Sequence, residues 1–572
     1  MKVAFWSRFG PKKVIPSTAI FAVLTILVLI PILFVVLAAF SGQTPRPGNI
    51  GFSDLTLRNF GILSSEEALT ALGNSLLIAA ASSIAALAIG SALAFICART
   101  DAPARRLIYF AGIMPLFLPS YVGALAWVVI AGPSAGLFNV LMRDLNLDFA
   151  INIYGMGGLA YILAIYNAPY AFLFVHGALA MMNPDLEDAA SVHGASLNNM
   201  LRQITFPLVL PAVLGSAILI FGLSIENFAV AAVVGTPGNV ATLPTLIYRL
   251  MNSFPVRGNE AAAVAIALTG VLILITVIQR LVISRRSFTT ITGKGVKPRL
   301  IGLGKWRWSV FTAAMAYFAA AVVIPMVALI LISIQKSQFM PSFSTLLQPD
   351  ALSLRAFREV ASSALLHSAA INSVTVSLAS ASLGVALGFC LAYTVYRSNL
   401  RARAAIEYLA MLPLAVPALV FGIGLLWTWL IMPIPIYGTV FVLIVAFVAH
   451  EIPQGFRGVA STIMQTHPDL EDSAVMLGAS RPKAVFHVTL PLMKVGLTST
   501  FLLLLLLGMR ELSVPLFLFT TDTRLLSIVI FDDLENGLLQ RSAAISIVYS
   551  AIIFVLSMIA LRLGRVTFGN RL

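Results

Sequence analysis

Three features of a soluble multidomain enzyme are scarce or missing in this chain. Only 10% of its 572 residues are charged, against about 25% in soluble proteins, so the charges cannot coat several soluble domains. The two cysteines, Cys97 and Cys390, exclude a disulfide framework and a cysteine-built metal site. The sequence contains no Gly-x4-Gly-Lys-Ser/Thr phosphate loop. We therefore expect no ATP hydrolysis by this chain and assign it no catalytic residue.

Apolar residues are abundant instead, at 59% of the chain with a mean hydropathy of +0.95. They form long blocks, and a helix needs about 20 apolar residues to cross the hydrocarbon core of a membrane. The blocks predict an all-α polytopic membrane protein with about twelve transmembrane helices. These spans lie near residues 17–40, 70–97, 107–131, 156–180, 208–233, 261–284, 308–334, 367–396, 405–431, 437–459, 492–519 and 543–561.

The basic residues lie between these blocks and predict the orientation. With the N-terminus inside, the inner tails and loops hold 23 of the 37 Lys and Arg residues, and the outer loops hold 10. The positive-inside rule therefore predicts an N-in/C-in topology. The net charge of +14 does not indicate a nucleic-acid partner, because it is not gathered on the face of a soluble domain.

The sequence repeats itself. Residues of one type recur at an offset of 298 early in each half and at an offset of 284 later. This pattern indicates two parallel six-helix repeats with one pathway between them. We expect a first half at 1–284, a basic cytoplasmic linker at 285–307 and a second half at 308–572. The matched positions are Asn74-Ser75 with Asn372-Ser373, Gly90 with Gly388, Arg99 with Arg397, Pro115 with Pro413, Pro119 with Pro417, Pro169 with Pro453, Pro184 with Pro468, Gly194 with Gly478 and Pro207 with Pro491.

Two cytoplasmic loops, 181–207 and 464–491, carry the same short acidic segment. The first reads Asn-Pro-Asp-Leu-Glu-Asp from Asn183, and the second reads His-Pro-Asp-Leu-Glu-Asp from His467. A proline in the first position and three acids near the positive end of the helix dipole predict one short helix in each loop. Gly194 and Gly478 are suited to end it in the left-handed conformation. Two copies at one offset favour a shared binding role over an ordinary connection between spans.

At these residues the sequence resembles the permease subunits of binding-protein-dependent ABC importers. Their signature loop is Glu-Ala-Ala, three residues, Gly, nine residues and Ile-x-Leu-Pro. In both copies Asp replaces the motif Glu, and a second acid, Glu187 or Glu471, stands directly before it. The fusion of two halves in one chain resembles iron(III)-type importers, as do Arg99-Thr100-Asp101 and Arg510-Glu511-Leu512. The signature matches are Asp188-Ala189-Ala190, Gly194 and 204–207 in the first half, and Asp472-Ser473-Ala474, Gly478 and 488–491 in the second.

The resemblance implies a permease subunit in a bacterial inner membrane that moves a small solute into the cytoplasm. An extracytoplasmic solute-binding protein would deliver the solute. Two separate ATP-binding cassette subunits would use ATP and Mg²⁺, while this chain itself would hold no cofactor and no metal. The short helices would be coupling helices that dock in those subunits. The residues assigned to coupling are Glu187, Asp188, Ala189, Ala190, Gly194, Glu471, Asp472, Ser473, Ala474 and Gly478.

Ionisable residues inside spans are costly and are candidates for a translocation pathway. They are Glu226, Glu451, Arg510 and Glu511, and Tyr121 is added because it lies beside the proline pair of the third span. Glu226 and Glu511 nearly correspond in the repeat, which predicts an acid at similar depth in both halves. The alternative is structural: for the acids, an ion pair with Arg510 or a role in holding a helix junction together, and for the prolines, packing kinks.

The resemblance favours iron(III) or an iron chelate as the cargo. Thiamine, phosphonate, sugar phosphate and polyamine are the alternatives for the same machinery. A twelve-helix proton-coupled secondary transporter is the alternative from another class. It would explain the span count, the duplication and the buried acids, but it would not explain two matching acidic helices at this spacing.

Overall fold

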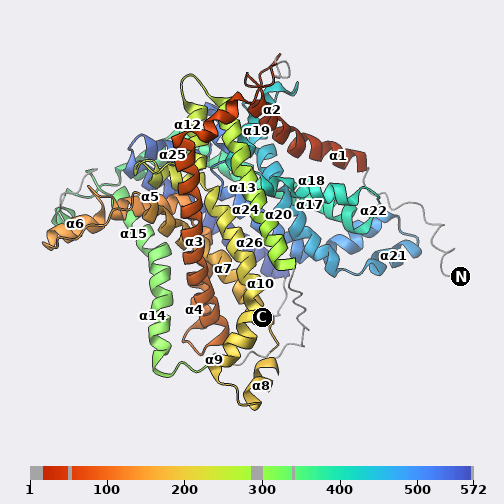
Figure 1. The fold of residues 1–572 in the computed structure, drawn as a ribbon, viewed down its shortest axis with the longest axis horizontal. Coiled ribbons are helices and arrows are strands. Elements are labelled where there is room, and N and C mark those ends of the chain that lie inside the picture. The colour runs from red at the N-terminus through yellow and green to blue at the C-terminus, as the bar shows by residue number, and fades with distance from the viewer. Residues whose placement is uncertain are drawn as a thin grey trace.

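The computed structural model describes residues 17–48, 54–183, 185–284, 300–337, 342–348, 350–398 and 400–567. Within these ranges the regular elements are helices, and β pairing is limited to isolated bridges such as that between Thr100 and Ile301. Long helices form the body of the molecule, and some short helices, such as α6 (Leu137–Asp144) and α8 (Asp185–Val192), project from it (Figure 1). The predicted all-α class is confirmed.

Nine helices in the described residues are long and apolar enough to cross a membrane, and three bent helix pairs pass the same test as single spans. Together they match the twelve predicted spans in order. The unbent spans are α1 with α2 (Ser17–Leu24 and Ile30–Phe40), α3 (Glu66–Arg99), α7 (Met156–Met181), α9 with α10 (Leu197–Met200 and Phe206–Ile225), α13 (Gly258–Ser284), α14 with α15 (Arg307–Phe318 and Ile324–Ser333), α17 (Ala364–Arg397), α20 (Val440–Gln465) and α26 (Leu539–Thr567).

Two of the bent spans turn at the prolines that the sequence singled out. The bend is 96° before α5 and 112° before α19, and Pro119 and Pro417 are the residues directly before these helices. Proline has no N–H to continue a helical ladder, so the expected bends are confirmed. The bent spans are α4 with α5 (Arg105–Ile113 and Ser120–Ala131), α18 with α19 (Arg403–Met411 and Ala418–Ile431), and α22, α23 and α24 (Arg481–Ala484, Leu490–Leu492 and Lys494–Arg510), the last bent by 73°.

Two predicted spans, 208–233 and 492–519, end earlier than expected, at Ile225 and Arg510. The chain becomes extended at Asn227 and Glu511. The Asn227 side chain accepts from the N–H of Val230, and that of Glu511 accepts from two N–H groups further along the chain. Such local side-chain bonds compete with the helical ladder and end both helices.

The first span of each half packs against the other half. Ile20 and Leu24 of α1 belong to one buried cluster with Leu391 of α17 and Phe456 of α20. In the same way, α14 packs against α4 and α15 packs against α5. The Tyr166 hydroxyl of α7 donates to the carbonyl oxygen of Ala321 at 3.1 Å. The two halves are therefore interlocked rather than merely adjacent.

Gly90 and Gly388, matched in the repeat, allow two close helix contacts. A Cβ on Gly90 would lie 2.3 Å from the carbonyl oxygen of Ala168 in α7, and a Cβ on Gly388 would lie 2.7 Å from the backbone of Gly455 in α20. No side chain fits at such distances, because packed atoms do not approach this closely. The glycine match thus marks the tightest packing between the second and fourth span of each half.

The Asn-Ser pairs that open the second span of each half hold two short helices, α12 (Leu243–Asn252) and α25 (Leu526–Glu535). Ser75 Oγ accepts from the N–H of Leu243 at 2.9 Å, and Ser373 Oγ accepts from the N–H of Leu526 at 2.8 Å. The first residues of α12 and α25 are therefore equivalent, at an offset of 283. Other short helices are α6 (Leu137–Asp144), α11 (Phe228–Val230) and α16 (Arg355–Ser362).

Residues 285–299, most of the predicted basic linker, lie outside the described residues, as do 1–16. The part of the linker that is described is tied to the end of α3. The N–H of Ile301 donates to the carbonyl oxygen of Arg99 at 2.8 Å, and the N–H of Leu303 donates to Asp101 Oδ1 at 2.8 Å. The boundaries of the two halves at 284 and 308 stay a prediction.

Candidate functional site: two anchored acidic helices

The two acidic segments form short helices with the same backbone geometry. They are α8 (Asp185–Val192) and α21 (Pro468–Met476); Pro184 lies outside the described residues. Gly194 and Gly478 follow them with φ of +77° and +95°, so the predicted left-handed ends are confirmed. The N–H of Ala195 donates to Ala190 O at 3.0 Å, and the equivalent bond joins Ala479 to Ala474 O at 3.1 Å.

Glu187 fixes α8 to the membrane-spanning body. It is 3% exposed, and its Oε1 accepts from Arg99 Nη2 at 3.1 Å and from Thr205 Oγ1 at 2.7 Å. Arg99 is the last residue of α3 and is itself 1% exposed. One carboxylate thus joins α8 to the second span and to the turn that opens the fifth.

Glu471 does the same for α21 with different partners. It is 5% exposed. Its Oε1 accepts from the hydroxyl of Tyr393 in α17 and from Arg481 Nη1, the latter at 3.0 Å, and its Oε2 accepts from Thr489 Oγ1 at 2.9 Å. Thr489 and Thr205 are equivalent residues at the offset of 284. A buried carboxylate with several donors holds its helix in one orientation.

The cation differs between the halves although the anchor is shared. Arg397 is the counterpart of Arg99, but its Nη2 donates to the carbonyl oxygens of Ile463 and Thr466 at the end of α20. Arg481 takes over the pairing in the second half, and its Nη2 also donates to Asp472 Oδ1 at 3.0 Å. Arg481 is a functional residue that the sequence motif does not include. Comparison of the halves could have indicated it, because the first half has Leu197 at the equivalent position.

The structure separates the two acids of each motif. Glu187 and Glu471 point inward, whereas Asp188 is exposed and Asp472 is half-buried. Apolar side chains lie on the outside of the same helices, with Leu186 47% and Leu470 50% exposed. Ala189, Ser473 and Gly194 are also exposed, as is Gly478, while Ala190 and Ala474 are half-buried. Each helix therefore has an anchored inner side and an accessible, partly apolar outer side.

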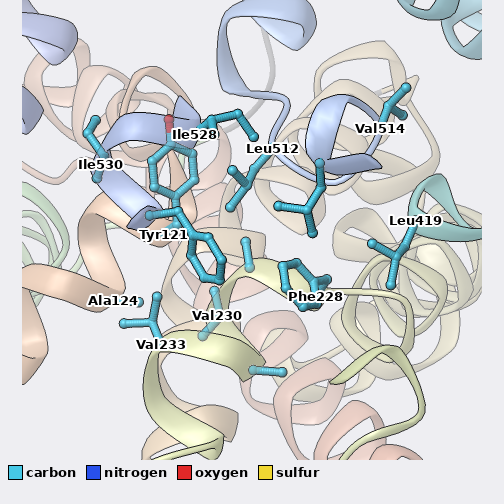
Figure 2. Close-up of a cluster of buried hydrophobic side chains, with 14 of the residues drawn as sticks. Tyr121, Ala124, Phe228, Val230, Val233, Leu419, Leu512, Val514, Ile528 and Ile530 are labelled. Carbon is cyan, nitrogen blue, oxygen red and sulfur yellow. The ribbon is translucent and has the colours of Figure 1, made fainter. Parts of the chain in front are cut away.

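The candidate pathway residues lie on other elements and close to one another, since Tyr121, Glu226 and Glu451 are each within electrostatic reach of Glu511. Tyr121 is 2% exposed and packs among Phe228, Leu512 and Ile528 (Figure 2). Glu451 is 3% exposed, and its Oε2 has no hydrogen-bond partner among the described residues.

Glu226 and Glu511, which the repeat nearly superposes, do not have the same surroundings. Glu511 Oε1 accepts from the N–H of Ser513 at 2.7 Å and of Val514 at 3.0 Å. Asn227 makes the matching bond in the first half, to the N–H of Val230 at 2.9 Å. The exact counterpart of Glu511 is therefore Asn227, and that of Glu226 is Arg510. Glu226 and Glu511 nevertheless lie within electrostatic reach of each other, and an acid at similar depth in both halves stays a prediction.

No ion pair between either acid and Arg510 is found among the described residues. Arg510 ends α24, and its Nε is buried with no hydrogen-bond partner in the described part of the chain. Glu511 Oε2 lies 4.0 Å from His450 Nε2 instead. Among the described residues, no group of three or more His, Cys, Asp or Glu side chains is arranged to hold a metal ion.

Comparison with known proteins gives the same twofold division. Residues 86–288 and 384–567 each match the family model described as "binding-protein-dependent transport system inner membrane component". The ferric transport system permease protein FbpB of Actinobacillus pleuropneumoniae is 26% identical over 461 residues, which cover 78% of this chain and 63% of that protein. This chain thus matches somewhat less than two thirds of the FbpB relative.

Two further relatives cover different parts of the chain. A probable ABC transporter permease protein, y4fN, of Sinorhizobium fredii is 24% identical over 96% of this chain and 95% of its own length. A putative 2-aminoethylphosphonate transport system permease protein, PhnV, of Salmonella typhimurium is 28% identical over 35% of this chain. The family model covers more than half of the chain in two copies. The chain therefore belongs to the binding-protein-dependent inner-membrane components of ABC importers, as a permease with both family domains fused in one multi-pass membrane protein.

Proposed function

We propose that this permease imports a small solute in response to two separate ATP-binding subunits that dock on α8 and α21. The observation that carries the proposal is the duplicated anchor. Glu187 and Glu471 fix the two helices to the transmembrane body. A helix held rigidly in this way transmits a movement of the docked subunit, whereas a flexible loop would not. The exposed Leu186 and Leu470 supply matched apolar contacts on the outer sides of α8 and α21.

The direction and the partners follow from this docking. The side that carries α8 and α21 would be cytoplasmic, with both termini on that side, as the basic residues predict. A solute-binding protein would deliver its cargo on the opposite side. ATP and Mg²⁺ would be used in the partner subunits, and the permease would hold neither. The assigned coupling residues divide into anchors, Glu187 and Glu471, and contact residues near Asp188 and Asp472.

Iron(III) or an iron chelate is the cargo that we propose, and the FbpB relative, named for ferric transport, supports it. A phosphonate is the second candidate, supported by the PhnV relative over a third of the chain. Glu226, Glu451 and Glu511 are proposed to line the pathway near the bends. The Glu511 carboxylate, which two backbone N–H groups stabilise, would favour a cationic cargo over a phosphonate.

Reconstitution tests the proposal. The permease is placed in proteoliposomes with its ATP-binding subunits and its solute-binding protein, and uptake of radioactive iron(III) and of 2-aminoethylphosphonate is measured with and without ATP. We expect ATP-dependent uptake of iron(III) only when the binding protein is present. Uptake that follows a proton gradient in liposomes holding the permease alone would overturn the proposal in favour of a secondary transporter.

A matched pair of variants tests the docking surface. Leu186→Asp combined with Leu470→Asp should abolish co-purification of the ATP-binding subunits and stop uptake, because a charge replaces each apolar contact. Leu57→Asp is the control. Leu57 is 71% exposed but lies between the first and second spans, on the side opposite α8. If the control and the double variant retain the subunits equally, these helices do not form the docking site.

A further inference from the structure

Two residues at equivalent positions of the repeat touch each other. Tyr248 lies five residues after Leu243, the first residue of α12, and Phe531 lies five residues after Leu526, the first residue of α25. The equivalent bonds from Ser75 and Ser373 fix this register. The ring centroids of Tyr248 and Phe531 are 6.1 Å apart, with an interplanar angle of 79°. Equivalent residues that meet must lie on or beside the axis that relates the two halves.

Further aromatic rings surround this pair. Phe228 lies 4.8 Å from Tyr248 and 5.6 Å from Phe531, measured between centroids. Phe517 lies 6.2 Å from Tyr248 on another side. Phe228 is fully buried and Phe531 is 2% exposed. Two rings from each half therefore fill the space around the axis, at spacings typical of favourable aromatic pairs.

The cluster lies on one side of the membrane, opposite α8 and α21. The full length of α10 separates α8 from α12, and α24 with its bend separates α21 from α25. In Figure 1 the labels of α12 and α25 lie close together, well away from α8. Phe228, from the residues that join α10 to α12, lies in the packed cluster of Figure 2. A solute that follows the axis would meet these rings first.

Acidic side chains of α25 lie near the hydroxyl of Tyr248 at the rim of the cluster. Burial, with the nearby carboxylates of Glu535 and Asp532, raises the pKa of Tyr248 to about 12. The hydroxyl therefore keeps its proton at neutral pH, and the Tyr248 ring brings no charge to the axis.

We propose that Tyr248 and Phe531, backed by Phe228 and Phe517, form the closure at the extracytoplasmic end of the pathway. The proposal rests on the function proposed above, because it takes the axis between the halves as the route of the solute. To let a solute pass, α12 and α25 must move apart. The rings are apolar and uncharged, so the closure blocks hydrated ions and polar solutes without binding them.

A double variant tests the closure. Proteoliposomes that hold the permease and its ATP-binding subunits are loaded with a small anionic fluorophore, and its release is followed without ATP. Tyr248→Ala combined with Phe531→Ala should release the dye several-fold faster than wild type. The control is Phe138→Ala combined with Phe149→Ala, since these rings also lie 6.1 Å apart at 82° but within one half. Equal release from both double variants would overturn the proposal.

A cross-link covers the case in which the alanine variant does not fold. Tyr248→Cys and Phe531→Cys are introduced together, and disulfide formation is verified by mass spectrometry of the digested permease. We expect oxidation to stop ATP-dependent uptake and reduction to restore it. Full uptake by the verified cross-linked permease would overturn the closure. Absence of uptake by wild type would instead count against the proposed function, while the dye release would still report on the rings.

Discussion

Arg99 donates to Glu187 across 3.1 Å in a place where both side chains are almost completely buried. Burying an ion pair is costly, and removing one partner of such a pair costs about 3–5 kcal/mol because the other charge stays behind. The pair is thus weak evidence for extra stability and stronger evidence for a defined geometry. It fixes the angle at which α8 leaves the transmembrane body.

Removal of the Arg99 guanidinium should therefore destabilise the protein strongly. Arg99→Met leaves Glu187 buried with Thr205 as its remaining donor, and we expect a marked fall in the thermal unfolding midpoint of the detergent-purified protein. Arg401→Met is the control because Arg401 is exposed. Adding Glu187→Gln to Arg99→Met should recover part of the loss, since the unpaired charge is gone. Equal midpoints for the two single variants would contradict the anchor.

The anchor formed by Glu471 and Arg481 can be tested by its effect on the mobility of α21. Arg481→Leu copies the first half, where Leu197 stands, but leaves Glu471 with two hydroxyl donors and no cation. We expect faster hydrogen exchange of the backbone amides of α21 and weaker stimulation of the ATP-binding subunits, with little change in α8. Arg481→Lys keeps the charge, so the hydrogen exchange of α21 in this variant should be intermediate between that of wild type and that of Arg481→Leu. Unchanged exchange in α21 would show that Arg481 does not hold it.

The glycine contact between α3 and α7 gives a stability prediction with an internal control. Gly90→Ala puts a Cβ 2.3 Å from the Ala168 carbonyl oxygen, so the helices must separate and the protein should lose stability. Gly73→Ala in the same helix meets no described atom within 4 Å. It should be neutral or stabilising by about 0.5–1 kcal/mol, because alanine favours a helix over glycine. The thermal midpoints of the two variants check the order.

The effect of the pathway acids on transport can be separated from their effect on folding and assembly. Glu511 accepts two backbone hydrogen bonds, and Gln keeps an acceptor oxygen for them, so Glu511→Gln should retain the fold. We expect Glu226→Gln and Glu511→Gln to reduce uptake of a cationic cargo while assembly with the ATP-binding subunits, measured by co-purification, stays normal. Uptake equal to wild type would remove both residues from the pathway.

Much of the fold could be predicted because bilayer thickness and proline chemistry act locally. Long apolar blocks have one stable solution in a membrane, the helix, and all twelve spans were found in order. The bends at Pro119 and Pro417 follow from a missing N–H. Even the Asn74-Ser75 match has a local meaning, since Ser75 holds the first turn of α12.

Which acid of each motif is buried and which is accessible could not be predicted in the same way. Glu187 and Asp188 are adjacent and chemically alike, and which one turns inward depends on partners such as Arg99 that are distant in the sequence. Tertiary packing also determines that Arg99 pairs with the buried glutamate in the first half and Arg481 in the second. The surroundings of Glu226 could not be predicted either, because its exact counterpart in the repeat is Arg510 and not an acid.

The exchange of the first spans between the halves has a consequence for biogenesis. Helices α1 and α2 are made before the other described helices, yet the surfaces that cover Ile20 and Leu24 belong to α17 and α20, which are made hundreds of residues later. Until then the part of this span that carries Ile20 and Leu24 must stay exposed to lipid, because its final neighbours have not been synthesised. The permease therefore cannot mature one half at a time, and synthesis of the whole chain must precede its last packing step.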